Sequence, residues 1–421
     1  MRQEGNFKLE NLTIKVQGTA FEVGPNNITR IRYYEDIRRC SVKLEVTLTD
    51  SEDALVSKIF GMEPLFLKMR DHKGNIIELD MIVYEIVDRQ IIDGKQMKGT
   101  LRCCNPDVTN SAGLLISQQF EDKNVGDIVQ DLLTKVLKTD IPIVKIDPSI
   151  NKITFSSNYW NPIKIIEWLT DKAIYAEKSG KSATAGFVFY ETQRGYHFRA
   201  MDALVKQEAK YVMKMGIESD EEEKEKGNLI EVSNLTVKKT SNVLKGLNYG
   251  SYTSRVTVFD IGNQKVEDFN FNAYELYDQI PKLNQGSLPD SYSKMSEKTP
   301  SRIMTKVINS KLFNAGEYTK DLTKILSQAS FRNTMFFNKE VEVEYIGDLS
   351  LEVGDVVELE NYIGRDREKD PVNSGKYIVG QIYREYTTTD SKLATKVILY
   401  NDSLGTGTET NTTNQVSSLL S

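Results

Sequence analysis

Residues able to carry out nucleophilic, acid–base or metal chemistry are few in this chain, apart from its carboxylates. The 421 residues include two histidines, His72 and His197, and three cysteines, Cys40, Cys103 and Cys104. Two histidines exclude a multi-histidine metal site and leave two candidates for a histidine-based triad. The adjacent cysteines have neither the spacing of a zinc knuckle nor that of a CxxC redox pair. The sequence therefore predicts no metal and no cofactor.

The settings of these residues favour structural roles. His197 alternates with two aromatic residues in an expected hairpin, which is typical of a packed histidine. His72 lies in a polar turn. The vicinal cysteines end an apolar strand whose one basic neighbour, Arg102, is too little to activate a thiolate. Trp160 and Trp168 are expected to pack in a core or an interface rather than to form a sugar-binding platform.

Carboxylates are the remaining candidates, because two of them about 5–10 Å apart can hydrolyse a glycoside. The chain has 60 acidic residues, so close pairs arise by chance. Glu340, Glu342 and Glu344 share a strand face that is expected to meet solvent. The run Asp220–Glu223 could bind a cation but is more simply a solvated loop. Phosphate-loop, dinucleotide, GxSxG and HExxH motifs are absent from the sequence. No catalytic residue is predicted, and the chain is not expected to be an enzyme.

Charge and composition exclude further classes. Lys and Arg number 54 and Asp and Glu 60, so the net charge is −6, which argues against a dedicated nucleic-acid binder. No apolar run approaches the ~20 residues of a membrane helix, so no membrane insertion is expected. The first residues lack the apolar stretch of a secretory signal, and three cysteines suit a reducing compartment. The length suggests two to four domains.

Residues 1–105 are predicted to be all-β and to form a small barrel or sandwich. One short helix is expected at Ser51–Phe60, with Ser51 as its N-cap. Alternating apolar residues predict strands at Leu9–Val16, Val42–Leu48, Leu65–Met69, Ile76–Val87 and Gln96–Cys104.

The chain then becomes α+β. A 3.6-residue apolar period predicts a helix at Asp122–Leu137, and Asn161 should cap a second helix that begins at Pro162. A hairpin is expected around the turn Gln193–Gly195, and another helix at Glu317–Phe331. Further strands are predicted at Lys210–Gly216, Ile230–Val237, Tyr252–Phe259 and Val266–Phe271. Residues 218–227 and 281–301 are interpreted as surface loops.

The last ordered part is predicted to be β again, and the tail 403–421 is rich in Ser, Thr, Asn and Gly. Strands are expected at Glu340–Ile346, Val353–Leu359, Lys376–Tyr383 and Thr395–Tyr400, the last two as a closing pair. The overall prediction is a β-dominated α+β fold.

Two segments carry a resemblance to a known family. One is the helix from Asn161 followed by the hairpin Gly186–Arg199, and the other is Leu349–Val357 with the strands Ser374–Val379 and Thr395–Tyr400. The first resembles the middle domain of the baseplate hub proteins of contractile-tailed, T-even-like bacteriophages, and the second is similar to the final tube domain of these hubs and of related injection-system tips. The Ser/Thr/Asn-rich tail resembles T-even-type tails. The resemblance covers about residues 1–402.

The resemblance implies two related antiparallel tube-like β-barrels that flank and interleave with an α+β middle domain. The barrels would be 1–105 and 206–245 plus 328–402, the middle domain 106–205 plus 246–327, and the tail 403–421. It implies a homotrimeric, pseudo-sixfold ring in the virion tail baseplate, assembled in the host cytoplasm. This ring would adapt the hexameric tail tube to a trimeric central spike, which in some machines carries a lysozyme domain. Tape measure protein and DNA would pass through its channel without specific binding.

Two alternatives remain open from the sequence. One is a tail-associated cell-wall hydrolase that acts through paired carboxylates. The other is the hub of a related bacterial contractile injection system.

Overall fold

The computed structural model describes residues 7–403 except for a set of internal segments. Those segments are 51–54, 93–95, 177–182, 218–226, 241–242, 251, 273–274, 276, 278–279, 285–299, 315–321, 365–366 and 389–391. The predicted loops 218–227 and 281–301 and the tail 403–421 fall largely outside the described residues. In the described part strands dominate over helices, so the predicted β-dominated α+β class is confirmed.

The first part of the chain is an antiparallel unit of seven strands, called the first β unit below. Apolar residues alternate along them, as in Leu44, Val46 and Leu48, whose side chains are buried in one core. The strands pair in the order β3-β4-β7-β6-β5-β1-β2. They are β1 (Lys8–Val16), β2 (Thr19–Glu22), β3 (Ile28–Asp36), β4 (Lys43–Asp50), β5 (Pro64–Arg70), β6 (Ile76–Ile92) and β7 (Gln96–Cys104).

The helix expected at Ser51–Phe60 is wrong in its described part. A single 3-10 turn spans Val56–Lys58. The carboxylate of Asp50 accepts a hydrogen bond of 2.6 Å from the backbone N–H of Leu55, so an aspartate at the strand end anchors this segment. Ser51, the predicted cap, lies outside the described residues.

A second β unit is built mainly from the end of the chain. Its main strands are β22 (Lys339–Ile346), β23 (Val356–Ile363), β25 (Gly375–Thr387) and β26 (Leu393–Asn401), with the short β24 (Glu368–Lys369) beside β23. Strands from the middle of the chain join it. β15 (Tyr211–Met215) pairs with β23 and with β16 (Leu229–Glu231), and β17 (Asn234–Lys239) pairs with β22. The single strand predicted at Ile230–Val237 is therefore two strands that join different partners.

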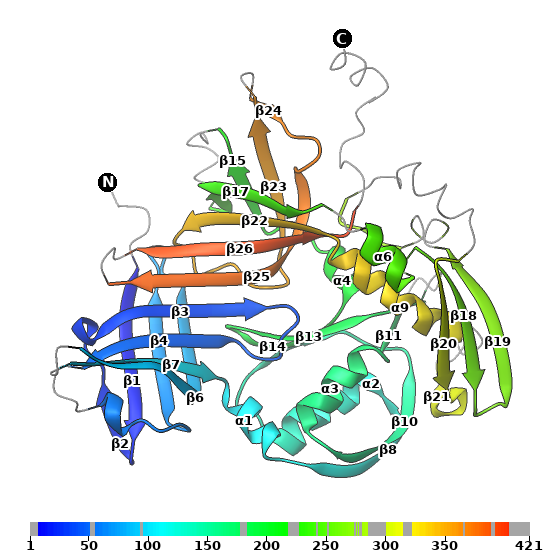
Figure 1. Ribbon diagram of the computed structural model, residues 1–421, viewed down its shortest axis with the longest axis horizontal. Coiled ribbons are helices and arrows are strands. Elements are labelled where there is room, and N and C mark those ends of the chain that lie inside the picture. Colours follow the sequence, from blue (N-terminus) through cyan, green and yellow to red (C-terminus); the bar gives the residue numbers. More distant parts are fainter. Residues whose placement is uncertain are drawn as a thin grey trace.

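Strand β25 connects the two β units. One of its edges pairs with β26, while the other pairs first with β23 at residues 375–378 and then with β3 at residues 381–387. The change of partner falls at Gly380, where the register with β26 also shifts. All strands of both units thus form one 15-stranded sheet, in which β26, β25, β3 and β4 lie side by side (Figure 1).

The middle of the chain forms small α+β layers that lie beside this sheet (Figure 1). Its first half contains the predicted helices and hairpin. The elements are α1 (Pro106–Ala112), β8 (Ile116–Asn124), α2 (Val125–Asp131) with a π-helical turn Leu132–Leu137, β9 (Ile143–Ile146), β10 (Lys152–Trp160), α3 (Pro162–Thr170), β11 (Ile174–Ala176), β12 (Ala183–Ala185), the hairpin β13 (Phe187–Thr192) and β14 (Gly195–Ala200), and α4 (Met201–Val205).

Helix α3 begins where Pro162 predicts, but the predicted side-chain cap by Asn161 is wrong. The Asn161 side chain makes no capping hydrogen bond to α3. It donates instead to the carbonyl of Ser111, at 2.7 Å, and so holds the end of α1. The start of one helix is thereby tied to the end of another.

The second half of the middle region is a three-stranded sheet flanked by two helices. β18 (Thr253–Asp260) lies between β19 (Lys265–Asn272) and β20 (Arg302–Ile308). The flanking elements are α6 (Val243–Tyr249), β21 (Phe313–Asn314) and α9 (Leu322–Phe336). In Figure 1, α6 and α9 lie between this small sheet and the end of the large one.

Candidate functional site

The histidine singled out in the hairpin has a structural environment. The His197 ring stacks on Tyr190, with centroids 4.8 Å apart and planes at 2°, and its Nε2 lies 3.2 Å from the Thr192 hydroxyl. Burial, reinforced by the positive charges of Arg199 and Arg194, lowers the pKa of His197 to about 3. The ring is therefore neutral near pH 7, which suits packing rather than proton transfer. His72 lies in the turn between β5 and β6.

The cysteines and tryptophans are also packed. Burial raises the pKa of Cys104 to about 11 and that of Cys40 to about 12, and it raises the pKa of Cys103 further still, so these thiols keep their protons. Trp160 and Trp168 meet edge to face at 5.8 Å beside the core around α3, as predicted.

The three glutamates of β22 lie on a polar sheet face that continues across both β units. Glu342 pairs with Lys238 on β17 at 3.1 Å and with Lys396 on β26 at 3.4 Å, and Glu344 pairs with the same Lys396 at 2.8 Å. Glu342 and Glu344 are therefore partners in cross-strand ion pairs rather than free carboxylates.

The same face carries a second row of ion pairs across the junction of the units. From β25 to β6 the charged residues alternate in sign: Glu385, Arg32, Glu45, Arg102 and Glu85. The four N···O distances, in that order, are 2.5, 3.6, 3.2 and 2.9 Å. We call the two rows together the ion ladder. A hollow of about 570 Å³ lies on this face and is lined by residues of both units. Because acids and bases alternate, the face is polar without a strong charge of one sign.

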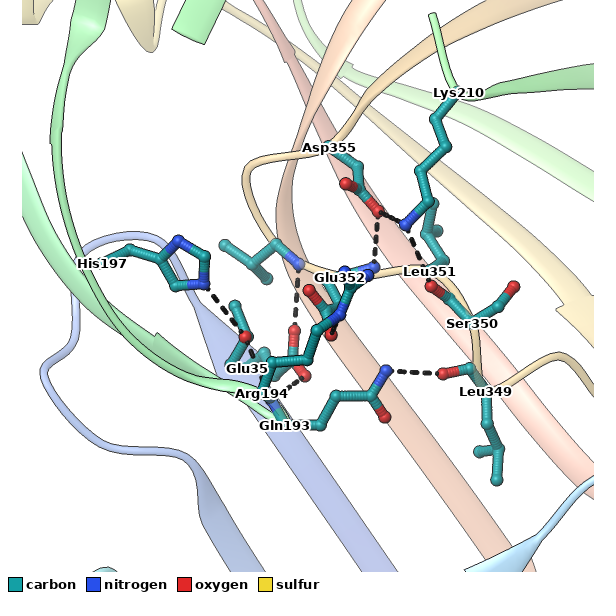
Figure 2. A network of polar contacts seen from close by, with 12 residues as sticks. Glu35, Gln193, Arg194, His197, Lys210, Leu349, Ser350, Leu351, Glu352 and Asp355 are labelled. Carbon is teal, nitrogen blue, oxygen red and sulfur yellow. Dashed lines mark hydrogen bonds and ion pairs between the residues drawn. The ribbon is translucent and has the colours of Figure 1, made fainter. Parts of the chain in front are cut away.

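On the opposite side of β3, the hairpin turn of the middle region is inserted between the units (Figure 2). Glu35 of β3 is buried and accepts three hydrogen bonds. They come from the Tyr33 hydroxyl at 2.5 Å, the Gln193 backbone N–H at 3.1 Å and the Val353 backbone N–H at 2.9 Å. Burial raises the pKa of Glu35, and the nearby Arg384 opposes that rise. One carboxylate thus joins the first unit, the hairpin and the second unit.

Further contacts fix the hairpin turn to the loop between β22 and β23 (Figure 2). Arg194 Nε donates to Glu352 at 2.6 Å, and the Gln193 amide donates to the Leu349 carbonyl at 2.9 Å. Lys210 binds Asp355 at 2.8 Å, on the strand side of the same loop.

The other edge of the hairpin is anchored in the first unit. Glu191 accepts hydrogen bonds from the Val42 N–H at 2.8 Å and from the Asn105 amide at 2.5 Å. Its burial raises the pKa of Glu191 to about 8. Glu191 and Arg194 therefore bind different units from neighbouring positions of one hairpin.

A buried ion triad ties the middle region to the second unit. Arg332 of α9 donates to Asp202 of α4 and to Asp402 just after β26, both at 2.8 Å, and all three side chains are buried. Each charge of this triad has a partner, as burial of charges requires.

Sequence reasoning did not single out Glu35, Arg384, Glu352 or Arg332. A usable signal existed for two of them. Glu35 lies on the same strand face as Ile31 and Tyr33, and Arg384 lies on the same strand face as Ile382. Both charged residues therefore stand at strand positions whose neighbours on that face are buried and apolar. Arg384 is 1% exposed and donates to the Leu351 carbonyl at 2.6 Å. A charged residue on the buried face of a strand was thus the sequence signal for the junction between the two β units.

No group of three or more histidine, cysteine or carboxylate side chains is placed to hold a metal ion among the residues that the structure describes. Within the same residues, no helix is both long and apolar enough to cross a membrane.

Comparison with known proteins gives a fold. No family model and no curated protein matches the chain. The 43 kDa tail protein of prophage MuSo2 from Shewanella oneidensis matches with a TM-score of 0.54 and 10% identity, over 95% of this chain and 100% of that one. The tail protein from Neisseria meningitidis MC58 matches with a TM-score of 0.53 and 10% identity, over 95% and 98%. The chain therefore has the fold of phage tail proteins, as its resemblance to baseplate hubs predicts.

Proposed function

We propose that this chain is a structural hub of a phage tail baseplate. Three copies would form a ring in which each contributes two β units, so that a threefold assembly presents six similar units. One side of the ring would match the hexameric tail tube, and the middle region would hold a trimeric central spike. The protein would then act in the virion tail, after assembly in the host cytoplasm.

The observation that carries this proposal is the continuity of the two β units through β25. The strand pairs with both units, so within each copy the two units have a fixed relative orientation and are not joined only by a flexible linker. A rigid pair of units is what a threefold ring needs to present sixfold spacing to a tube.

The domain division expected from the sequence becomes part of this proposal. The first tube-like barrel would be 1–105, the second 206–245 plus 328–402, and the middle domain 106–205 plus 246–327. Support comes from β15 and β17, which lie in the middle of the sequence yet pair with β23 and β22.

The ion ladder is the proposed lining of the channel. DNA binding by release of counterions needs Lys and Arg that are available to phosphates. On this face Arg32, Arg102 and Lys396 are paired with glutamates, so DNA or tape measure protein would pass without being held.

Exposed apolar side chains on the small sheet support contact with another protein in the assembly. Val266, Phe259 and Val307 are exposed and stand opposite one another on the three neighbouring strands. Apolar clusters of this kind mark interaction surfaces. A cell-wall hydrolase has weaker support, because the buried carboxylates Glu35 and Glu352 are engaged in the hydrogen bonds that join the units.

The test is the mass of the purified chain by mass photometry, alone and with the co-expressed tube and spike proteins. A particle near three times 47.9 kDa, alone or with the spike, is expected. A monomer that binds neither protein would reject the hub, and cleavage of purified cell wall would support the hydrolase instead.

A further inference from the structure

A cleft of about 740 Å³ lies where the small sheet, helices α6 and α9, and the second β unit meet. Four cations from four separate elements line it. They are Arg38 from the β3–β4 turn, Lys172 after α3, Lys239 at the end of β17 and Lys306 on β20. Elements this far apart in the sequence bring the same sign of charge to one hollow.

Cations outnumber carboxylates in the lining of the cleft, although the chain as a whole is acidic and Arg38 also lies 3.4 Å from Asp36. Among the described lining residues Asp171 is the one carboxylate. Burial lowers the pKa of Lys306, and the charge of Lys172 lowers it further, while Asp171 opposes the shift. A concave site concentrates such a field on whatever enters it.

A second observation points to an acceptor in the same cleft. Asn338 lines it and is 3% exposed, and its Nδ2 has no hydrogen-bond partner within the protein. A buried amide donor without an acceptor costs free energy unless something supplies that acceptor. A carboxylate or carbonyl oxygen of a bound group would do so.

The lining also has apolar side chains, beside polar ones such as Asn333 and Thr334. Val307, Ala329 and Phe337 contribute hydrocarbon surface beside the cations. Nucleic-acid backbones are usually followed by cations spread along a groove, whereas these converge on one hollow. The lining therefore fits a protein segment better than a phosphate chain.

We propose that this cleft binds an acidic segment of a neighbouring protein, in which carboxylates around an apolar side chain meet Arg38, Lys172, Lys306 and the amide of Asn338. The apolar side chain would pack against Phe337 and Val307. This site does not depend on the trimeric ring, because every element that forms it belongs to one copy of the chain.

The test uses the full chain and a fluorescein-labelled peptide of alternating glutamate and leucine, followed by fluorescence anisotropy. The double variant Lys172→Gln/Lys306→Gln is expected to bind about tenfold more weakly, since two cations are lost. The matched control is Lys8→Gln/Lys15→Gln, which removes two exposed lysines of β1 and should leave binding unchanged.

Asn338→Leu separates binding from folding. Because the buried Nδ2 donor of Asn338 has no partner, replacing the amide with a side chain of similar size should preserve or raise the unfolding midpoint while weakening peptide binding several-fold. The proposal is overturned if the lysine variant binds like the unaltered chain. It is also overturned if a single-stranded oligonucleotide or inorganic phosphate displaces the peptide more effectively than unlabelled peptide does. Mass photometry of the same samples reports the trimer separately.

Discussion

Gly380 of β25 lies directly against the ring of Tyr400 on β26. A Cβ atom added to Gly380 would lie 2.0 Å from Cδ2 of that ring. The glycine stands where β25 leaves β23 and begins to pair with β3, and its carbonyl accepts a hydrogen bond from the Ile37 N–H at 2.9 Å. The absence of a side chain at this position lets one strand serve both β units.

Gly380→Ala is therefore expected to lower the free energy of unfolding by about 1–3 kcal/mol, because the Tyr400 ring must move out of a packed site. Urea unfolding followed by far-UV circular dichroism measures this change. Gly24→Ala is the matched control, since a Cβ there meets nothing within 4 Å, and its effect should stay below about 0.5 kcal/mol. Equal effects of the two variants would contradict the steric role of Gly380.

The buried triad predicts that an Arg–Asp pair contributes more to stability when it is buried than when it is exposed, at a similar N···O distance. Arg332→Ala leaves Asp202 and Asp402 buried without their cation and should cost about 3–5 kcal/mol. Arg255→Ala removes an Arg–Asp pair of 2.7 Å whose two side chains are about half exposed, and should lower the free energy of unfolding much less. Chemical unfolding measures the free energy of unfolding of both variants. Similar decreases in the two would show that the triad does not stabilise the contact between the middle region and the second unit.

Glu191 predicts a pH dependence of stability. Its folded pKa of about 8 lies above the ordinary value of 4.5, so the folded state binds this proton more tightly than the unfolded state. Its contribution is fully present below about pH 4.5 and is lost as the pH rises through about 8, by an amount on the order of a few kcal/mol.

Glu191→Gln imitates the protonated side chain and should flatten this fall between pH 5 and 8. Thermal unfolding across that range measures the slope. Glu121→Gln, at an exposed position of β8, should keep the original slope. A slope that Glu191→Gln leaves unchanged would assign the pH dependence to other groups.

The ion ladder predicts that removing its glutamates raises the affinity of this face for DNA. Glu45→Gln/Glu385→Gln leaves Arg32 without both of its carboxylate partners. This variant should gain binding to double-stranded DNA that weakens steeply with salt, whereas the unaltered chain should show little binding at physiological salt.

The matched control for the ladder is Glu121→Gln/Glu267→Gln, which changes the net charge equally at exposed positions of β8 and β19. Filter binding or fluorescence anisotropy at several salt concentrations measures how steeply the DNA affinity falls with salt. If both variants gain the same affinity, net charge rather than the paired face governs contact with DNA.

The sequence by itself determined most element types and their order, with the Ser51–Phe60 helix and the single strand Ile230–Val237 as exceptions. Alternation in segments such as Glu340–Ile346 reports which side chains a strand buries, and the helical period of Asp122–Leu137 does the same for α2. Asn161 and Pro162 located the start of α3, although the Asn161 side chain bonds to α1. These are local properties, since backbone sterics and burial periodicity act over a few residues.

Only the tertiary structure decided which elements meet. That β25 would pair with both β23 and β3 depends on a partner about 350 residues away in the chain, and no local pattern encodes a partner's identity. Glu35, Arg194 and Glu352 came together for the same reason. So did Lys172 and Lys306, whose shared cleft exists because packing of distant segments, rather than their own sequences, brought two like charges to one hollow.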